Sequence, residues 1–438
     1  MIILRTVKNI SSLNIVASIL LFLTAIMAAI IANSPMAPIY QDFLQQELHL
    51  RIGNFNLLSH GGHPLKMIEF INDCLMTVFF LAVGLEIKRE LLVGELSSFR
   101  KAALPFVAAC GGMLLPVVIY VLLVTPGTPE MRGMAIPMAT DIAFSLGVLS
   151  LLGKRVPLSL KIFLTAFAVV DDIGGILVIA LFYSSEVAYG YLIVAAILFI
   201  FLYYMGKFGM TQKIFFLFFG IIIWYLFLQS GIHSTISGVI LAFIIPARPR
   251  LDAGKYIKRI RDIMSKFPVS GSDKIVLTNE QIATLKQVEH ASDRVISPLQ
   301  SLEDNLHNAV NFVILPLFAF ANAGVVFSGG GNILGNVSIA IAAGLLLGKF
   351  IGIYFFTWLA IKSGLAPMPR GMNWRNIAGV ALLGGIGFTV SLFIVNLSFA
   401  GNYPELLNQA KFGVLMGTAL AVFLGYVVLN VVLPKRQE

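Results

Sequence analysis

Two adjacent carboxylates, Asp171 and Asp172, lie in the otherwise uncharged run TAFAVVDDIGGILVIALF at residues 165–182. The run is long enough to cross a bilayer, which takes roughly 20 mostly apolar residues. A charged side chain is costly at bilayer depth, so functional use is the default interpretation. A buried carboxylate binds either a proton or a small hard cation. Competition of these two cations for one alternately exposed site is sufficient for antiport.

The other ionisable residues deep in apolar runs are Asp73, Asp141 and Lys349. A structural ion pair with Lys349 could satisfy only one carboxylate, so at least one other must be protonated, hydrated or bound to a cation. Adjacent helix residues point about 100° apart. One of Asp171 and Asp172 can therefore pair with Lys349 while the other faces a water-filled cavity.

Two apolar runs carry helix-breaking residues near their centres. GMAIPMATDIAFSLGVLSLLG contains Pro137, Thr140 and Asp141, and IAGVALLGGIGFTVSLFIV contains a cluster of glycines that begins at Gly384. Such residues let a membrane helix open, although kinks or packing glycines are the simpler alternative. Paired interrupted spans indicate a transporter with inverted repeats and a site near the midplane. Oxygen ligands from Asp141, Asp172 and the backbone near Thr140 suit Na⁺ or Li⁺ better than a soft metal.

The composition indicates a multi-span membrane protein, because 58% of the 438 residues are hydrophobic and only 12% are charged. The apolar segments predict twelve spans, near residues 12–33, 67–87, 102–124, 134–152, 157–183, 187–205, 213–229, 232–246, 304–325, 337–360, 376–398 and 409–433. Spans three to five and ten to twelve would be the two repeats. With the N-terminus inside, most of the 31 Lys and Arg residues fall on inside segments. Both termini are therefore expected to be cytoplasmic, and the net charge of +9 needs no nucleic-acid partner.

Two segments outside the predicted spans have distinct patterns. Residues 247–303 form a long cytoplasmic loop, in which the basic stretch 248–266 could lie against anionic lipid or simply be a positive-inside loop. Thr278 starts a predicted short helix there with a capping-box pattern. On the outside, residues 48–58 predict a small β-hairpin with a turn at Gly53-Asn54. An isolated hairpin is marginally stable in water, so we expect it to pair with the same hairpin of a second subunit.

The chain resembles the NhaA family of bacterial Na⁺/H⁺ antiporters over about residues 12–430, apart from the 247–300 loop. The motifs that carry the resemblance are FINDCLMTVFFLAVGLEIKREL, AIPMATDIAFSLGVLSLLG, VPLSLKIFLTAFAVVDDIGGILVIALFY, SGIHSTISGVI, LPLFAFANAGV, GLLLGKFIG and GGIGFTVSLFI. The resemblance implies that Asp172 is the principal ion-binding carboxylate, and that Asp171 pairs with Lys349 in one state and releases it in another. It also implies that Thr140 and Asp141 lie at a helix break, where Asp141 offsets the half-helix N-termini that meet there.

The resemblance further implies two crossed, interrupted helices, a homodimer in the inner membrane, and electrogenic exchange that is activated at alkaline pH. The implied pH-response residues are Glu86, Arg89, Glu90, Glu303 and His307 on the cytoplasmic side, and His233 near the outer end of span eight. One departure matters. Where the best-known pattern has Glu-His, this chain has Glu303-Asp304, so its pH profile cannot be carried over.

The expected protein is thus a single all-α polytopic transporter domain over residues 1–438. It would exchange cytoplasmic Na⁺ or Li⁺ for external H⁺ at Asp172, Asp171 and Asp141, without a cofactor. An intramembrane aspartyl protease would also use two membrane carboxylates, but GGIGF lacks the aspartate of its GxGD site and a buried lysine opposes a shared proton. A cation channel would need a continuous pore lined by charge or carbonyl rings. The sequence contains no GxxxxGK[ST] motif, so nothing in it indicates ATP hydrolysis. We expect no enzyme activity.

Overall fold

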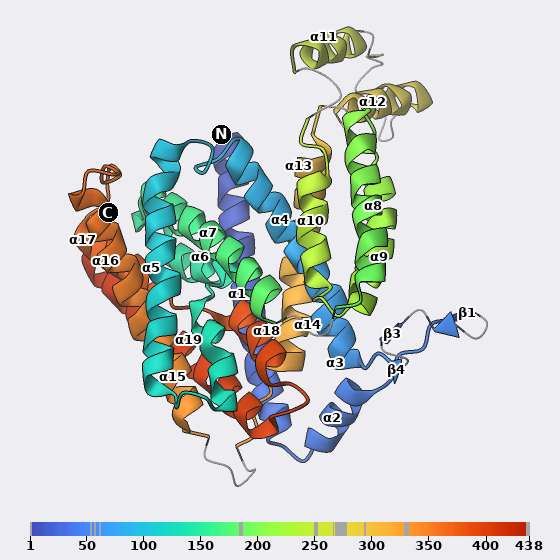
Figure 1. The fold of residues 1–438 in the computed structure, drawn as a ribbon. Coiled ribbons are helices and arrows are strands. Elements are labelled where there is room, and N and C mark those ends of the chain that lie inside the picture. Colours follow the sequence, from blue (N-terminus) through green and yellow to red (C-terminus); the bar gives the residue numbers. More distant parts are fainter. Residues whose placement is uncertain are drawn as a thin grey trace.

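The computed structural model describes residues 2–52, 55–56, 58–60, 63–183, 187–248, 253–265, 267, 278–292, 295–327 and 333–434. Helices dominate this part of the chain (Figure 1). Unbroken α-helices that are long and apolar enough to cross a membrane are α1 Ile2–Ala32, α5 Phe99–Leu123, α7 Leu158–Phe182, α8 Tyr189–Lys207, α9 Lys213–Ser230 and α19 Pro404–Val432. Helices form because lipid offers no partner for backbone N–H and C=O groups.

Two further long segments contain a short π-helical stretch. The first, Met67–Leu92, consists of α3 Met67–Phe70, the π-helical η1 Ile71–Leu75 and α4 Met76–Leu92. The second, Asn336–Lys362, consists of α15 Asn336–Ala343, the π-helical η5 Gly344–Gly348 and α16 Lys349–Lys362. Single π turns inside helices are frequent at functional sites. Asp73 lies within η1, and Lys349 follows η5 directly.

Two pairs of helices are bent at a break, at the two positions where the sequence predicts interrupted spans. η2 Pro129–Met138 and α6 Ile142–Leu151 meet at 45°, and α17 Trp374–Leu383 and α18 Phe388–Phe399 meet at 42°. Within the described residues, eight helical segments can each cross a membrane, and counting each bent pair as one span gives ten.

The predicted eighth and ninth spans coincide with shorter helical segments. These are α10 Thr235–Ile244 and the run α13 Pro298–Ala309, η4 Val310–Ile314 and α14 Leu315–Asn322. The count of twelve spans and the inverted repeats therefore stay predictions.

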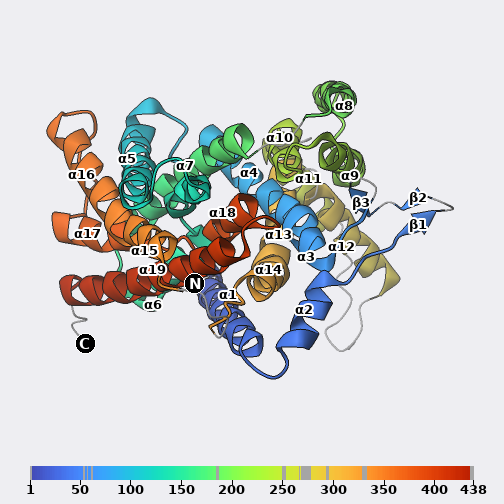
Figure 2. The ribbon, with the colours of Figure 1, turned by 60° about the horizontal axis from the view of Figure 1, so that its bottom comes forward.

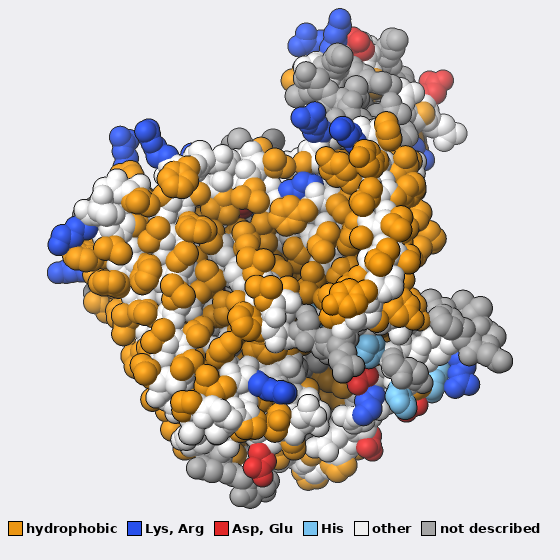
Figure 3. Space-filling model, in the orientation of Figure 1, with side chains coloured by type: hydrophobic (Ala, Val, Ile, Leu, Met, Phe, Trp, Pro, Cys, Tyr) orange, Lys and Arg blue, Asp and Glu red, His pale blue; other side chains and the backbone are white. Residues whose placement is uncertain are grey.

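Apolar side chains form a broad belt across the face of the helices that Figure 3 shows. Ile193, Ile197 and Ile200 of α8 illustrate this, since each exposes more than half of its surface. A contiguous exposed apolar surface of this extent is what a lipid environment requires. The chain is a multi-pass membrane protein by this criterion.

Polar elements lie beyond the belt at both ends. α11 Ala253–Met264 and α12 Asn279–Ser292 project at the end where both chain termini lie (Figure 1). The predicted capping box of α12 is confirmed, because Thr278 N donates to Gln281 Oε1 (2.9 Å) and Gln281 N donates to Thr278 Oγ1 (3.3 Å). A short helical turn, η3 Gly153–Arg155, links α6 to α7.

The strands lie away from the termini, after α2 Ala37–Gln45 (Figures 1 and 2). β1 Arg51–Ile52 pairs antiparallel with β2 Phe55–Asn56, and β3 Ser59–His60 pairs antiparallel with β4 His63–Pro64. The predicted turn residues Gly53 and Asn54 lie outside the described residues.

Close helix packing positions the buried lysine. α5 and α16 cross at Gly111 and Gly352, where a Cβ on Gly352 would overlap the carbonyl oxygen of Gly111. Glycine lets the two backbones approach this closely. α5 also packs on α7, so the start of α16, with Lys349, is held toward the helix that carries Asp171 and Asp172.

Candidate functional site

The two breaks meet and satisfy each other's backbone. Thr140 Oγ1 donates to the carbonyl of Gly384 (2.8 Å), and Ser145 Oγ donates to that of Leu383 (3.0 Å). These carbonyls end α17, where the last turn of a helix leaves acceptors without intrahelical partners. Side chains of one broken span thus cap the other, which lets non-helical backbone persist inside the protein.

Asp141 joins the two helices that start at the breaks. Its Oδ1 accepts from Phe144 N (3.0 Å) and so caps α6, while Oδ2 accepts from Thr389 N (3.2 Å) and Thr389 Oγ1 (2.6 Å) at the start of α18. Asp141 N also donates to Ile386 O (2.6 Å). A carboxylate is favoured where helix N-termini converge, because each carries partial positive charge. Asp141 therefore offsets two half-helix N-termini.

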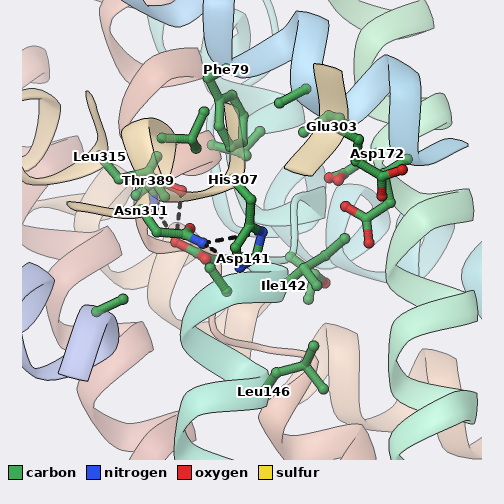
Figure 4. A pocket seen from close by; sticks show the side chains of 18 of the residues that line it. Phe79, Asp141, Ile142, Leu146, Asp172, Glu303, His307, Asn311, Leu315 and Thr389 are labelled. Carbon is green, nitrogen blue, oxygen red and sulfur yellow. Dashed lines mark hydrogen bonds between the residues drawn. The ribbon is translucent and has the colours of Figure 1, made fainter. Parts of the chain in front are cut away.

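Asp172 differs from Asp141 in having no protein partner. Its side chain is 8% exposed, and it makes no hydrogen bond or ion pair with any residue that the structure describes. It lines a cavity of about 220 Å³ (Figure 4). The polar residues around this cavity are Glu86, Arg89, Thr140, Asp141, Asp172, Glu303, His307, Asn311 and Thr389. A buried, unpaired carboxylate in a polar cavity is a place for a cation or a proton.

Asp171 does not line this cavity and pairs with the buried lysine. Lys349 Nζ donates to Asp171 Oδ2 at 2.6 Å, and both side chains are fully buried. Within the described chain, no three His, Cys, Asp or Glu side chains are grouped as in a metal cluster. The adjacent aspartates thus have separate environments, as their roughly 100° angular separation requires.

Four of the residues expected to respond to pH line the same cavity, a fifth, Glu90, pairs with one of them, and one lies elsewhere. Arg89 pairs with Glu303 (Nε to Oε1, 2.9 Å) and with Glu90 (3.2 Å), and Glu86 and His307 also line the cavity. Burial raises the pKa of Glu303, although Arg89 opposes this. The exception is His233, which does not line the cavity. Its Nε2 lies 2.6 Å from the carbonyl oxygen of Tyr183.

Sequence reasoning missed Thr389 and Asn311. Thr389 of α18 donates a hydrogen bond to Asp141, and Asn311 contacts His307 (Nδ2 to Nε2, 3.1 Å). A threonine two residues after a glycine break, in the first turn of an apolar helix, is a helix-start signal that could have identified Thr389. Nothing in the local sequence marks Asn311.

The structure is a bundle of apolar helices in which two broken helices cap each other beside an unpaired buried carboxylate. This arrangement defines a secondary transporter for a small cation. The family model described as "Na+/H+ antiporter 1" matches residues 8–429. The chain is 75% identical to a Na⁺/H⁺ antiporter NhaA of Bacteroides thetaiotaomicron over the full length of both, and 61% identical to one of Phocaeicola vulgatus over 95% of this chain and 94% of that one. The chain belongs to the NhaA family of Na⁺/H⁺ antiporters, and it is a transporter rather than an enzyme.

A solved sodium/proton antiporter from Methanocaldococcus jannaschii overlays with a TM-score of 0.48 and 14% identity, over 98% of this chain and 97% of that one.

Proposed function

We propose that the protein exchanges cytoplasmic Na⁺, or Li⁺, for external H⁺ by alternating access, and so contributes to sodium and pH homeostasis. The observation that carries the proposal is the unpaired carboxylate of Asp172 in the cavity beside the two helix breaks. One carboxylate that binds a proton or a cation, but not both, couples the two fluxes without any further chemistry. The transported ions are substrates, and the proposed exchange needs no cofactor.

The ion site is proposed to centre on Asp172, with oxygen ligands from Asp141 and Thr140. These groups line one cavity, and carboxylate and hydroxyl oxygens suit a hard cation. Asp171 belongs to the site through Lys349, which it holds at 2.6 Å. We propose that this pair opens in another state of the cycle, where Asp171 joins Asp172 in holding Na⁺.

The proposed setting is the bacterial inner membrane, with twelve spans in inverted repeats and both termini in the cytoplasm. Both termini lie at the end where α11 and α12 project, which supports a common side for these segments (Figure 1). α11 carries Lys258 and Arg261 together with exposed Ile257 and Met264. A basic helix with apolar side chains fits the surface of an anionic bilayer, so we propose that residues 248–266 lie against lipid.

Everted membrane vesicles test the function directly. A proton gradient is imposed, Na⁺ or Li⁺ is added, and proton release is followed by dequenching of a pH-sensitive dye. Cation-dependent release in vesicles that contain the protein, and none in vesicles without it, is expected. No cation-dependent release between about pH 6.5 and about pH 9 would refute the proposal.

We also propose that Glu86, Arg89, Glu90, Glu303 and His307 make exchange depend on pH, with His233 acting from a separate position. Burial raises the pKa of Glu303 above that of a free glutamate. As pH falls through this raised value Glu303 becomes neutral and the ion pair with Arg89 is lost, and as pH rises the pair forms. Ionised Glu303 at the cavity mouth thus favours entry of a cation, and this attraction is lost as pH falls through its raised pKa.

Glu303→Gln, which mimics the protonated carboxyl, is therefore expected to lower the exchange rate several-fold and to reduce its dependence on pH. The measurement is the dequenching rate over the same pH range. Glu280→Gln, a charge change on α12 away from the cavity, serves as the control and should leave the profile unchanged. A Glu303→Gln profile that overlays the parent profile would rule out Glu303 as a pH-response group.

The β-strands support a proposed homodimer. β1 and β2 pair antiparallel after α2, and two short strands alone are marginally stable in water. Deletion of residues 48–58 is expected to convert a dimer into a monomer in detergent, as measured by size-exclusion chromatography with light scattering. The melting temperature of the deletion variant checks that the helical body is intact. An unchanged molar mass would exclude this dimer contact.

A further inference from the structure

Three asparagines from distant parts of the chain form a hydrogen-bonded triad, which we call the amide triad: Asn72, Asn322 and Asn396. Asn396 Nδ2 donates to Asn322 Oδ1 (2.7 Å), and Asn322 Nδ2 donates to Asn72 Oδ1 (2.8 Å). Asn322 is fully buried, and the three residues lie on α18, α14 and η1. Each amide brings a carbonyl oxygen and two N–H donors into an apolar bundle.

The amide triad lies along the helix that leaves the ion site. α18 starts at the break, where Thr389 holds Asp141, and runs away from the face that carries the termini (Figure 1). Thr389 and Asn396 are seven residues apart, which places them on the same side of α18 at an axial separation of about 10 Å. The triad is therefore the next polar layer beyond the site, on the side opposite the cavity mouth at Arg89 and Glu303.

A second cavity, of about 530 Å³, reaches the residue that precedes Asn322 on α14. Ala321, the neighbour of Asn322, lines it, and Tyr40 of α2 donates from its hydroxyl to Phe320 O (2.6 Å) at its edge. The described lining includes Glu405 and Lys411 of α19. Figure 2 brings this face forward and shows α1, α2, α14 and α19 at it. One cavity thus reaches Thr389, seven residues before Asn396, and the other reaches Ala321, next to Asn322.

We propose that the amide triad is the gate that separates the ion site from the second cavity, and that the cation leaves the protein between Asn396 and Asn322. This proposal rests on the proposed function. Amide oxygens can replace water around a hard monovalent cation during passage, as carbonyl oxygens do in ion pathways. In the described structure the triad is closed by its own hydrogen bonds, while the first cavity reaches Asp172 from the end that carries the termini. Hydrogen bonds between amide side chains of different helices can also serve only to stabilise helix packing. The test distinguishes the two roles.

The test measures from which side the triad is reached. In the full-length protein, Cys74→Ala and Cys110→Ala remove both native cysteines. Asn396→Cys is then exposed to a membrane-impermeant, quaternary-ammonium thiol reagent, in right-side-out and in everted vesicles. Leu397→Cys, one residue along α18 and also partly buried, is the matched control. We expect Asn396→Cys to be labelled from the face opposite the termini, and faster during turnover, while Leu397→Cys stays unlabelled.

A transport measurement completes the test. Asn396→Leu, which removes the amide at similar volume, is expected to lower the exchange rate at least about tenfold with an unchanged apparent Na⁺ affinity from the side of the termini. Asn396→Ser, which keeps a hydroxyl, should recover part of the rate. Absence of sided labelling, or an Asn396→Leu rate equal to that of the parent, would overturn the gate. If the parent itself shows no exchange, the proposed function fails instead, whereas the labelling result still reports on access to the triad.

Discussion

Asp172→Asn is expected to abolish cation-dependent proton exchange, with a loss of at least about 100-fold in the dequenching rate at every pH. Asparagine keeps the size of the side chain but cannot release a proton or supply a negative charge. Asp141 cannot substitute, because both of its oxygens already accept hydrogen bonds from Phe144 and Thr389. Exchange at a single competing site therefore ends when this carboxylate is neutral.

The same substitution is expected to leave the fold intact, which makes the loss interpretable. Asp172 makes no hydrogen bond or ion pair in the described structure, so asparagine breaks no contact and removes the desolvation cost of a buried charge. The melting temperature in detergent should be equal to or above that of the parent. Asp42→Asn on the exposed surface of α2 is the control for a charge change alone. An Asp172→Asn protein with the parental apparent Na⁺ affinity would show that the ion binds elsewhere.

Much of this site could be predicted from residue type and helix geometry. Carboxylates in an apolar run indicate function, and adjacent residues on a helix cannot share one environment. The structure has this division: Asp171 contacts Lys349, and Asp172 faces the cavity. The breaks near Thr140 and Gly384 were also predictable, because proline and clustered glycine are the residues that open a membrane helix.

The contacts between the breaks could not be predicted. The bonds from Thr389 to Asp141 join residues 248 positions apart, and the capping of Gly384 by Thr140 spans 244 positions. Local sequence specifies which residues can cap a helix, but only tertiary packing decides which helix end they reach. The amide triad was missed for the same reason, since asparagine within a span has no periodic signal of its own.

Span counting from hydropathy also has a physical limit here. α10 has ten residues, shorter than a bilayer requires, and the predicted ninth span is divided among α13, η4 and α14. Apolar composition alone does not reveal where the helical hydrogen-bond pattern changes. Neighbouring helices satisfy the freed backbone groups at such points, as Ser145 does for Leu383.

Lys349→Gln has the second large expected effect, and it concerns stability. Lys349 is the partner of Asp171 in a fully buried pair, so its removal leaves an unpaired carboxylate in the bundle. Loss of one member of a buried pair typically costs about 3–5 kcal/mol. We expect a marked fall in the melting temperature in detergent, unlike the unchanged or higher value for Asp172→Asn. Lys362→Gln at the exposed end of α16 is the matched control, and a Lys349→Gln protein as stable as the control would contradict the buried pair.

The double variant Asp171→Asn/Lys349→Gln separates the structural role of the pair from its role in exchange. Two neutral side chains that can hydrogen-bond to each other should recover most of the lost stability, because no buried charge remains without a partner. The resulting coupling energy between the two sites is the quantity that a double-mutant cycle measures. If the Asp171–Lys349 pair carries one of the exchanged protons, the stabilised double variant moves one proton fewer per cycle, and an exchange left with one proton per Na⁺ is electroneutral and loses its dependence on membrane potential. If the double variant recovers both stability and electrogenic exchange, Lys349 only balances Asp171, and the exchanged protons must be carried by Asp172 and the groups around its cavity.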